Sequence, residues 1–578
     1  MYLYSKFSIV FRRMSILARL KSLFNEFIPM SVICWREGYR KDFLLADIRA
    51  GITVGLIALP LAMAFAIGSG VAPARGLYTA IFAGFLISLL GGSRVQIGGP
   101  TGAFIIIVYD VIQRHGYEGL AIATFIAGIM MIIMGLARFG FFLKFIPYPV
   151  TVGFTTGIAL VIFSSQMKDF FGLNLASVPA DFIEKWTSFW QHASTWNPWA
   201  ATLSASTLLL IFLFRRINPK FPGVIIAVIL ATLAAIVFKL PVETIESKFG
   251  VIPDKFPIPC LPKFPLDQIP TIFPDAIAIA LLGAIESLLS ALVADGMTGH
   301  RHRSNSELVA QGLANIGSVF FGGIPATGAI ARTTANIKMG AKTPVSGMLH
   351  AVTLLFLMLV LAPAASKVPL PALAAVLIFV AWNMSELHHF FAILRGQRSD
   401  ALVLLITFLL TVLVDLTAAV QVGALLAAIL FIKRMSDATT VKICQLVLEE
   451  NVDEHPAAHD SELILRKDVP ENATVFEITG PFFFAVSDLL NEQLRQMDVF
   501  PKTFILRMHK VPAIDASGVH AIQQFAEKCR QANITFLLSG VNRSLGVIFK
   551  KTGIDETIKK EHIFRNLNDA LSYARQHS

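Results

Sequence analysis

Long apolar stretches, many of them about twenty residues in length, restrict the fold of this chain more than any other feature. Clear examples are residues 45–67, 71–90, 118–137, 274–294, 345–362 and 401–417. A helix of about 20 mostly apolar residues is long enough to cross the hydrocarbon core of a bilayer. Only 15% of the 578 residues are charged, whereas soluble proteins average about 25%. The pattern predicts a polytopic α-helical membrane protein and argues against a soluble enzyme.

We expect fourteen spans. They are placed at residues 45–67, 71–91, 99–112, 118–138, 147–165, 200–215, 222–239, 274–295, 306–321, 326–337, 345–363, 371–384, 400–416 and 418–434. Several of these segments are short or interrupted.

The charges of the connections predict the orientation, because cytoplasmic loops of membrane proteins are enriched in Lys and Arg. With a cytoplasmic N-terminus, every short inner connection is basic. These connections hold Arg94, Arg138 and Lys144, Arg215, Arg216 and Lys220, Arg301 and Arg303, Lys338 and Lys342, Arg395 and Arg398, and Lys433 and Arg434. An even number of spans then places both termini in the cytoplasm. The formal net charge of +10 follows largely from this pattern and requires no nucleic-acid partner.

The sequence divides into four predicted parts. Residues 1–44 are basic and amphipathic, without a signal-peptide cleavage site, and we expect a cytoplasmic arm on the membrane surface. The alternative is a disordered tail. The transmembrane domain occupies residues 45–436, and the polar residues 437–462 are typical of a linker. Residues 463–578 alternate strands and helices, which indicates a small α/β domain.

Within this last domain the predicted elements are strands at 473–480, 503–509 and 534–540 and helices at 487–497, 517–532 and 543–553. The sequence "IDASG", residues 514–518, stands between a strand and a helix. Asp515 is suited to cap the helix N-terminus. Ser517 falls in the first turn, where an added phosphate would meet free N–H groups. The alternative is a plain capped helix without a regulatory role.

A short phrase occurs twice in the spans. "GGPTGAF" at residues 98–104 returns as "GIPATGAI" at residues 323–330, and each copy precedes an apolar run. Fourteen spans form two sets of seven, and an odd number of spans per set inverts the second set. The phrases then open spans three and ten, which are equivalent positions of an inverted repeat. Paired Gly/Pro-interrupted segments of this kind indicate the midplane binding site of a transporter.

The residues of the phrase suit an anion. Pro fits the first turn of a helix, Gly and Ala let a ligand approach the backbone, and Thr supplies a hydroxyl group. Two opposed helix N-termini direct free N–H groups and positive dipole ends at one point. The candidate substrate-binding residues are Thr101, Gly102, Ala103, Ala326, Thr327 and Gly328. The alternative is that the phrase only kinks two packed helices.

Ionisable residues inside a membrane are functional candidates. Glu286 lies in the middle of a span, and Ser290 lies one turn later on the same face. A carboxyl group at this depth suits proton coupling, because it can be neutralised when an anion enters nearby. Glu286 and Ser290 could instead provide oxygen ligands to a sodium ion. A third alternative is a structural carboxylate paired with a neighbouring helix.

Arg332 follows Thr327 by five residues, on the same short helix. A guanidinium group there would add positive potential to an anion cavity. The alternative is an arginine whose side chain extends to the inner face. Asp110, Asp295, His350 and Asp415 fall near predicted span ends, and we expect them at the membrane interfaces.

The chain resembles the sulfate permease (SulP) family, the prokaryotic relatives of the solute carrier 26 anion transporters. The resemblance covers nearly the whole chain, and its tail is similar to a sulfate transporter and anti-sigma antagonist (STAS) domain. The resemblance rests on "AGITVGLIALPLAMAFAIGSGVAPARGLYTA", "GGPTGAF", "GAIESLLSALVADGMTGHRHRSNSELVAQGLANI", "PATGAIARTTAN", "AWNMSE" and the "DASG" sequence of the tail. Among family members, the chain looks most similar to bacterial ones that take up C4-dicarboxylates such as succinate or fumarate.

The resemblance implies a seven-plus-seven inverted repeat with a core and a gate domain, elevator-type movement and a homodimer in the bacterial inner membrane. It places Thr101, Ala326, Thr327 and Arg332 near the anion, and Glu286 with Ser290 at the coupling site. Sodium-coupled bicarbonate relatives carry Asp and Thr there, so Glu and Ser favour protons. Leu61 is a departure, because many relatives have Gln at that position. In anti-sigma antagonists the serine equivalent to Ser517 is phosphorylated.

The predicted function is secondary active transport of sulfate or a C4-dicarboxylate, coupled to protons, with a regulatory STAS domain that has a cytoplasmic protein partner. No cofactor or metal is expected, because the four cysteines lie far apart and no nucleotide-binding loop or catalytic triad is present. Three alternatives remain open. They are a sodium-coupled bicarbonate transporter, an uncoupled anion channel or exchanger, and a membrane-tethered sensor that signals through the STAS domain.

Overall fold

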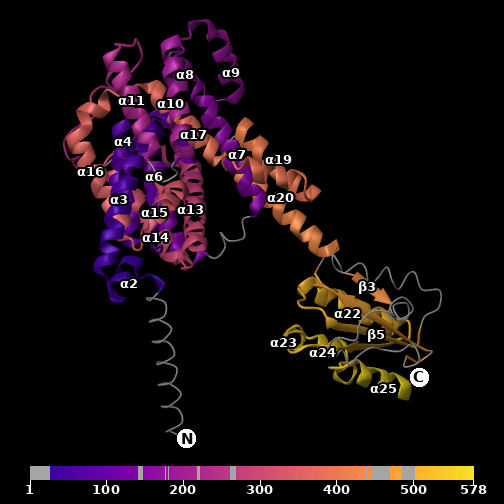
Figure 1. Cartoon of the computed structure of the whole chain (residues 1–578). Coiled ribbons are helices and arrows are strands. Elements are labelled where there is room, and N and C mark those ends of the chain that lie inside the picture. The colour runs from indigo at the N-terminus through magenta and orange to yellow at the C-terminus, as the bar shows by residue number, and fades with distance from the viewer. Residues whose placement is uncertain are drawn as a thin grey trace. The chain divides into compact units, whose positions relative to one another are not determined.

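The computed structural model describes residues 26–140, 147–175, 178–179, 181–217, 222–260, 268–414, 416–437, 440–443, 469–470, 472–483 and 501–577. The chain divides into two compact units, Met1–Leu425 and Leu426–Ser578. The first unit is helical, and the described part of the second contains a sheet with flanking helices (Figure 1).

The spans predicted at 99–112 and 326–337 begin with non-helical residues, and all fourteen predicted spans overlap helices. These are α3 (Lys41–Gly68), α4 (Pro73–Tyr78) with the π-helical turn η1 (Thr79–Ala83) and α5 (Gly84–Leu90), α6 (Phe104–Leu136), α7 (Tyr148–Ser165), α10 (Pro198–Ile217), α11 (Gly223–Val237), α13 (Ile269–Thr298), α14 (Ser304–Phe320), α15 (Ile330–Lys338), α16 (Val345–Ser366), α17 (Leu370–Met384), α19 (Arg398–Leu413) and α20 (Leu416–Asp437). Among the described residues, eight helical stretches are long and apolar enough to cross a membrane. The protein is a polytopic α-helical membrane protein.

Helix α6 contains two of the predicted spans. Gly116 interrupts it with backbone angles of φ 67 and ψ −173, which are not helical. Glycine adopts this conformation without the steric penalty that a side chain would add. The predicted span 99–112 therefore ends before this break, and the predicted span 118–138 begins after it.

The helices of the first unit pack in two sets. Helix α6 packs against α13 and α14, and α3 packs against α16. Helix α17 packs against α7 and α10, and α7 also packs against α19. The first set carries both copies of the repeated phrase, whereas the second set contains the helices that face it.

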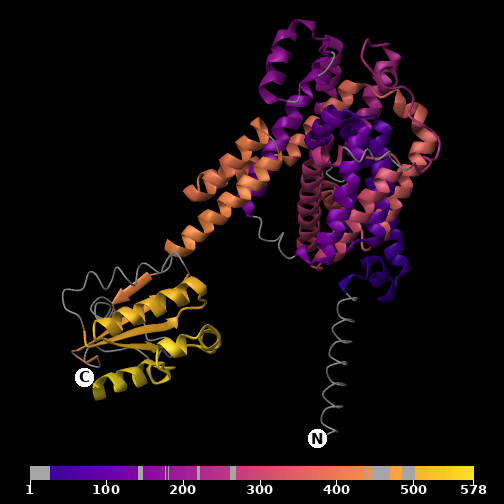
Figure 2. The same cartoon turned by 180° about the vertical axis from the view of Figure 1, so that it is seen from behind.

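Short helices lie at the two ends of this unit. Helix α2 (Met30–Arg36) lies at one end, and α8 (Met167–Phe171) with α9 (Phe182–Gln191) lies at the opposite end, as the two views show (Figures 1 and 2). The Met30 N–H donates to the Gly91 carbonyl at 2.9 Å, and the Ser31 hydroxyl donates to the Leu89 carbonyl at 2.6 Å. The described part of the N-terminal arm is therefore docked on the end of α5. Residues 1–25 lie outside the described residues.

The two copies of the repeated phrase meet in space. Strand β1 (Gly98–Gly99) pairs antiparallel with β2 (Thr327–Gly328), with Gly98 opposite Gly328 and Gly99 opposite Thr327. Equivalent segments of two inverted halves should run in opposite directions where they meet. The pairing therefore agrees with the inverted repeat that the odd number of spans per half predicts.

The C-terminal unit contains a four-stranded sheet in the order β3-β4-β5-β6. The strands are β3 (Thr440–Ile443), β4 (Ala473–Thr479), β5 (Thr503–Lys510) and β6 (Thr535–Ser539). Strand β3 is antiparallel to β4, and the other pairs are parallel. Strand β3 lies in residues 437–462, where the sequence predicts a linker, so the sheet begins before residue 463. The predicted helix 487–497 lies outside the described residues.

Alternating side chains give the sheet two buried faces. Phe476, Phe504 and Leu506 pack with α22 (Ala516–Gln531), whereas Val475 and Ile505 pack with α25 (Leu567–His577) on the other face. Successive residues of a strand point to opposite faces, which explains the division. Two further short helices, α23 (Arg543–Thr552) and α24 (Ile554–Thr557), complete the described part of the unit.

Burial distinguishes the four residues expected at the membrane interfaces. His350, near the start of α16, is 0% exposed, because Gly51 and Gly55 of α3 allow the two helices to approach closely at this point. Asp110 and Asp295 bond to Arg114 and His302, respectively. Asp415 lies outside the described residues.

The contact of α6 with α14 depends on two glycines. A Cβ atom added at Gly312 would stand 2.4 Å from the Gly128 carbonyl oxygen, which is backbone and cannot rotate away. We expect Gly312→Ala to cost about 1–3 kcal/mol of stability through overpacking. The apparent melting temperature of the purified protein should fall by a few degrees. Gly296→Ala is the control, because a Cβ there meets no atom within 4 Å, and an equal fall in both variants would contradict this prediction.

Candidate functional site

The candidate site is built around the paired strands β1 and β2. Helix α15, which follows β2, lies along the extended residues before α6. The Ile97 N–H donates to the Thr333 hydroxyl at 3.1 Å, and the Ile97 carbonyl accepts from the Ala329 N–H at 2.8 Å. Asn336 donates to the Val95 carbonyl at 2.9 Å. The unwound backbone of the first half is thus bonded to the short helix of the second half.

The first copy of the phrase ends in a helix N-terminus. Helix α6 begins at Phe104, with Ala103 as its N-cap residue. Among the described residues, the N–H groups of Gly102 and Ala103 have no hydrogen-bond acceptor. Free N–H groups at a helix start, together with the helix dipole, attract an anion. Thr101 and Ala103 are buried, at 6% and 4% exposed.

Two side chains from the facing helices close over Gly102. A Cβ added at Gly102 would stand 2.8 Å from the Met384 sulfur and 3.3 Å from Cδ1 of Ile162. Met384 ends α17, and Ile162 lies near the end of α7. The helix N-terminus of the first phrase therefore faces the second set of helices. The flexible Met384 side chain covers it.

The second copy of the phrase is held by side chains of α13 and α14. Asn315 accepts from the Ala326 N–H at 2.8 Å and donates to the Ala326 carbonyl at 2.9 Å. The Ser287 hydroxyl accepts from the Gly328 N–H at 3.1 Å and lies 2.6 Å from the Thr327 hydroxyl. Thr327 also donates to the Gly283 carbonyl at 3.1 Å. The Thr327 hydroxyl thus holds β2 against α13, and Ala326 and Gly328 are buried beside it.

Glu286 lies at the first copy of the phrase. Its Oε2 accepts from the Thr101 hydroxyl at 2.9 Å, and its side chain is half-buried. The Arg332 guanidinium lies within electrostatic reach of this carboxyl group. The structure therefore brings together Thr101, Glu286 and Arg332, which lie in three different spans.

Arg332 is buried rather than extended to the inner face. Its side chain is 4% exposed and donates to the Pro100 carbonyl. Its Nη1 atom has no hydrogen-bond partner among the described residues. Nη1 lies against Gly99, where an added Cβ would be 2.7 Å away and where φ is +145. Only glycine leaves space for the guanidinium at the point where the two phrases pair.

The Ser290 hydroxyl bonds to α15. Ser290 is 0% exposed, and its hydroxyl lies 3.1 Å from that of Thr333. Thr333 also accepts from the Ile97 N–H, so Ser290 supports the paired backbone. Among the described residues, no group of three or more His, Cys, Asp or Glu side chains could hold a metal ion.

Sequence reasoning missed several residues of the site. Ser287, Asn315 and Thr333 bind the unwound backbone, Gln96 donates to the Ser287 carbonyl at 3.1 Å, and Met384 covers Gly102. Asn315 carries a signal, because an amide inside an apolar span needs a partner. Ser287 and Thr333 carry no such sequence signal, since hydroxyl groups in helices commonly bond to the preceding turn of their own helix.

The C-terminal unit has its own candidate residues. Asp515 is the N-cap of α22 and accepts from the Gly518 N–H at 2.7 Å, which confirms the predicted cap. Ser517 is exposed in the first turn of this helix. Its hydroxyl is therefore exposed to solvent at the helix N-terminus.

Comparison with known proteins agrees with these features. The model of the sulfate permease family matches residues 44–407, and that of the STAS domain matches residues 465–570. The chain is 43% identical to "Putative sulfate transporter YvdB" of Bacillus subtilis (strain 168), over 91% of this chain and 97% of that protein. It is 30% identical to "Bicarbonate transporter BicA" of Picosynechococcus sp., over 90% of this chain and 94% of that protein.

A solved structure has the same fold. The murine solute carrier 26 family member A9 anion transporter, in an inward-facing state, superimposes with a TM-score of 0.84. The two chains are only 19% identical, and the match covers 96% of this chain and 95% of the other. At this identity the comparison supports the fold alone.

Asn315 provides a test of how the second phrase is held. We expect Asn315→Leu to leave the buried N–H and carbonyl of Ala326 without partners, at a cost of about 1–3 kcal/mol for each group. The apparent melting temperature of the purified protein should fall. Leu313→Ala on the same helix is the control, because that side chain is 40% exposed at the surface of the unit. A larger effect of the control would show that Asn315 is not required.

Proposed function

This chain belongs to the sulfate permease family of anion transporters, and from that premise we propose that it carries a small oxyanion or a C4-dicarboxylate by secondary active, proton-coupled transport. It is a transporter and not an enzyme. Sulfate is the first candidate substrate, since the relative with 43% identity is named as a sulfate transporter. The alternative of a sodium-coupled bicarbonate transporter rests on the relative named for bicarbonate.

The single observation that carries the proposal is the junction of the two phrases. Free N–H groups at the start of α6, the Thr101 hydroxyl and the partly unpaired Arg332 guanidinium lie in one place. The N–H groups and the guanidinium can donate to an anion, and the guanidinium is a permanent cation. The Thr101 hydroxyl proton is donated to Glu286, and it becomes available to an anion once a protonated Glu286 no longer accepts it. Such a set binds an anion through charge and hydrogen bonds rather than through a fitted shape. It therefore suits sulfate, a carboxylate or bicarbonate.

Glu286 is proposed as the proton-coupling group. An anion that enters beside a carboxylate meets a like charge, and this repulsion disappears if the carboxylate takes up a proton. Thr101 connects the two events, because its hydroxyl donates to Glu286 and also lies at the anion site. A sodium ion is the less favoured partner, since the Ser290 hydroxyl is engaged by Thr333.

The remaining features of the proposal concern movement and location. The helices that carry Thr101, Glu286 and Arg332 would move as a core against a gate that includes α7 and α17, in the manner of an elevator. We place the protein as a homodimer in the bacterial inner membrane, with both termini cytoplasmic, in accordance with the basic inner connections. The STAS domain would regulate transport through a cytoplasmic protein partner.

Glu286→Gln tests the coupling. The variant mimics the protonated side chain and keeps the donors of the anion site, so we expect normal anion binding and exchange. Acceleration of sulfate uptake by an inward proton gradient should be lost, because no proton is carried at this position. The measurement is uptake into proteoliposomes with and without a pH gradient. Glu118→Gln, an exposed position of α6, is the matched control.

Three results would contradict this scheme. A Glu286→Gln variant that responds to the gradient as wild type does would remove Glu286 from the coupling. Wild-type flux that ignores the gradient would favour an uncoupled channel or exchanger. Substrate binding by wild type without any flux would favour a sensor.

Removal of the C-terminal unit tests its regulatory role. The truncation should end after Asp437, because deletion from residue 463 would leave β3 as an unpaired strand. We expect substrate affinity within about twofold of wild type, since no residue of the candidate site is removed, and a changed transport rate. Sulfate binding and uptake by the purified truncated protein provide the comparison. Loss of all affinity would show that the C-terminal unit contributes to the site.

A further inference from the structure

A cavity lies beside the first turns of α6, where Ile105 directly follows the first copy of the phrase. Its volume is about 820 Å³. It is lined by residues of α3, α6, α12 (Ile245–Phe249) and the start of α13, and by residues of α7, α8, α9, the end of α19 and the start of α20. Thr101, Glu286, Thr327 and Arg332 do not line it. It lies on the side of the unit where α8 and α9 stand, which the basic-loop pattern predicts to be external (Figure 1).

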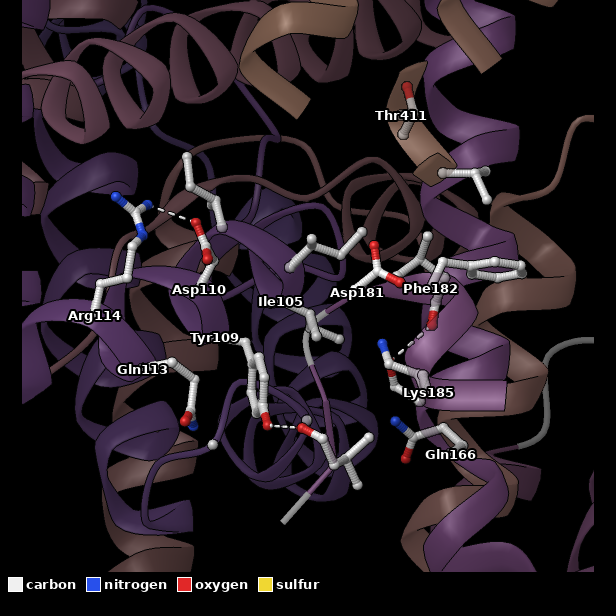
Figure 3. A pocket seen from close by; sticks show the side chains of 18 of the residues that line it. Ile105, Tyr109, Asp110, Gln113, Arg114, Gln166, Asp181, Phe182, Lys185 and Thr411 are labelled. Atoms are coloured by element: carbon white, nitrogen blue, oxygen red, sulfur yellow. Dashed lines mark hydrogen bonds and ion pairs between the residues drawn. The ribbon is translucent and has the colours of Figure 1, made fainter. Parts of the chain in front are cut away.

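The carboxylates of this cavity are already engaged. Arg114 bonds to Asp110 at 2.5 Å and to Asp275 at 2.9 Å. Lys248 bonds to Asp169 at 3.4 Å. Asp181 caps α9, where its Oδ1 accepts from the N–H groups of residues 183 and 184 at 2.9 Å. Figure 3 shows the Arg114–Asp110 pair on the opposite side of the cavity from Lys185.

Two lysines of the cavity have no such partner. Lys185 is 4% exposed, and its Nζ donates to the Ser165 hydroxyl at 3.1 Å (Figure 3). Lys168 donates to the Leu175 carbonyl. Neither lysine forms an ion pair with a carboxylate among the described residues. Gln166, which is 4% exposed, also lines this side of the cavity.

A buried ammonium group without a counter-charge is costly, because burial removes its hydration and a hydroxyl group restores only part of it. An anion in the cavity would provide the missing charge. We propose that Lys185, Lys168 and Gln166 form a second anion site, which receives a small oxyanion from the predicted external side before it reaches the paired phrases. A volume of 820 Å³ leaves room for such an anion with part of its hydration shell.

The ammonium of Lys185 is poised to respond to pH. Burial is the main cause that lowers its pKa to about 8, and the nearby charge of Asp181 opposes this shift. Below pH 8 the group is charged and attracts an anion, whereas above pH 8 it loses its proton and the attraction. The other charged groups that line the cavity are Asp110, Arg114, Lys168, Asp169, Lys248 and Asp275.

The site is tested by equilibrium dialysis of radiolabelled sulfate against the purified full-length protein, near pH 7 and near pH 9.5. We expect wild type to show two binding components near pH 7 and to lose most of one near pH 9.5. In Lys185→Gln, sulfate affinity for this component should be at least about tenfold lower than in wild type at both pH values. Lys185→Arg should retain it at both, because a guanidinium stays charged.

Lys248→Gln is the matched control, because Lys248 lines the same cavity but is paired with Asp169. It should behave as wild type. Binding does not depend on transport, so this outcome is separate from the proton-coupling scheme, and Asn315→Leu should weaken the other component only. A single component in wild type, or a second component that Lys185→Gln leaves unchanged, would overturn the proposal. If Lys185→Gln does not fold, loss of the pH response in Lys185→Arg supports it, and an unchanged response overturns it.

Discussion

The central constraint on this structure is an extended backbone inside a membrane. The hydrocarbon core offers no water to pair with N–H and C=O groups, so an unwound segment must find partners in protein or line a water-filled cavity. The two copies of the repeated phrase meet this requirement together. Gly98 and Gly99 pair with Thr327 and Gly328, and Ile97 bonds to both Ala329 and Thr333. Each half of the repeat therefore completes the other, and neither unwound segment has a full set of partners alone.

The repeat is symmetric in backbone but not in chemistry. Thr101 and Thr327 occupy equivalent places in the two phrases. The Thr101 hydroxyl donates to Glu286, whereas the Thr327 hydroxyl is engaged by Ser287 and Gly283. Both partners of Thr327, like Glu286, lie on α13. Thr101 thus connects Glu286 to the proposed anion site. Thr327 instead holds strand β2 against α13, and β2 directly precedes the helix that carries Arg332.

Much of the fold could be predicted from sequence because its signals are local. Apolar length locates the helices, basic connections predict their direction, and the repeated phrase identifies the inverted halves. Glu286 and Arg332 stand out because ionisable residues are rare at this depth. Ser287, Thr333 and Met384 do not stand out in the sequence, since their roles depend on which helices contact each other in the folded protein. The buried position of His350 was missed for the same reason, because it follows from Gly51 and Gly55 on a helix some 300 residues away in sequence.

The presence of one arginine and one carboxyl group at the site limits how charge can cross the membrane under the proposed mechanism. Arg332 and an ionised Glu286 cancel, so the empty core carries no net charge at the site. A monovalent anion with a protonated Glu286 also leaves the site neutral, since the anion then balances Arg332. A divalent anion would leave one negative charge, and moving it against the membrane potential costs about 2.3 kcal/mol per 100 mV. One coupling carboxyl group therefore suits bicarbonate or a singly protonated dicarboxylate without further groups, whereas neutral transport of sulfate requires a second proton.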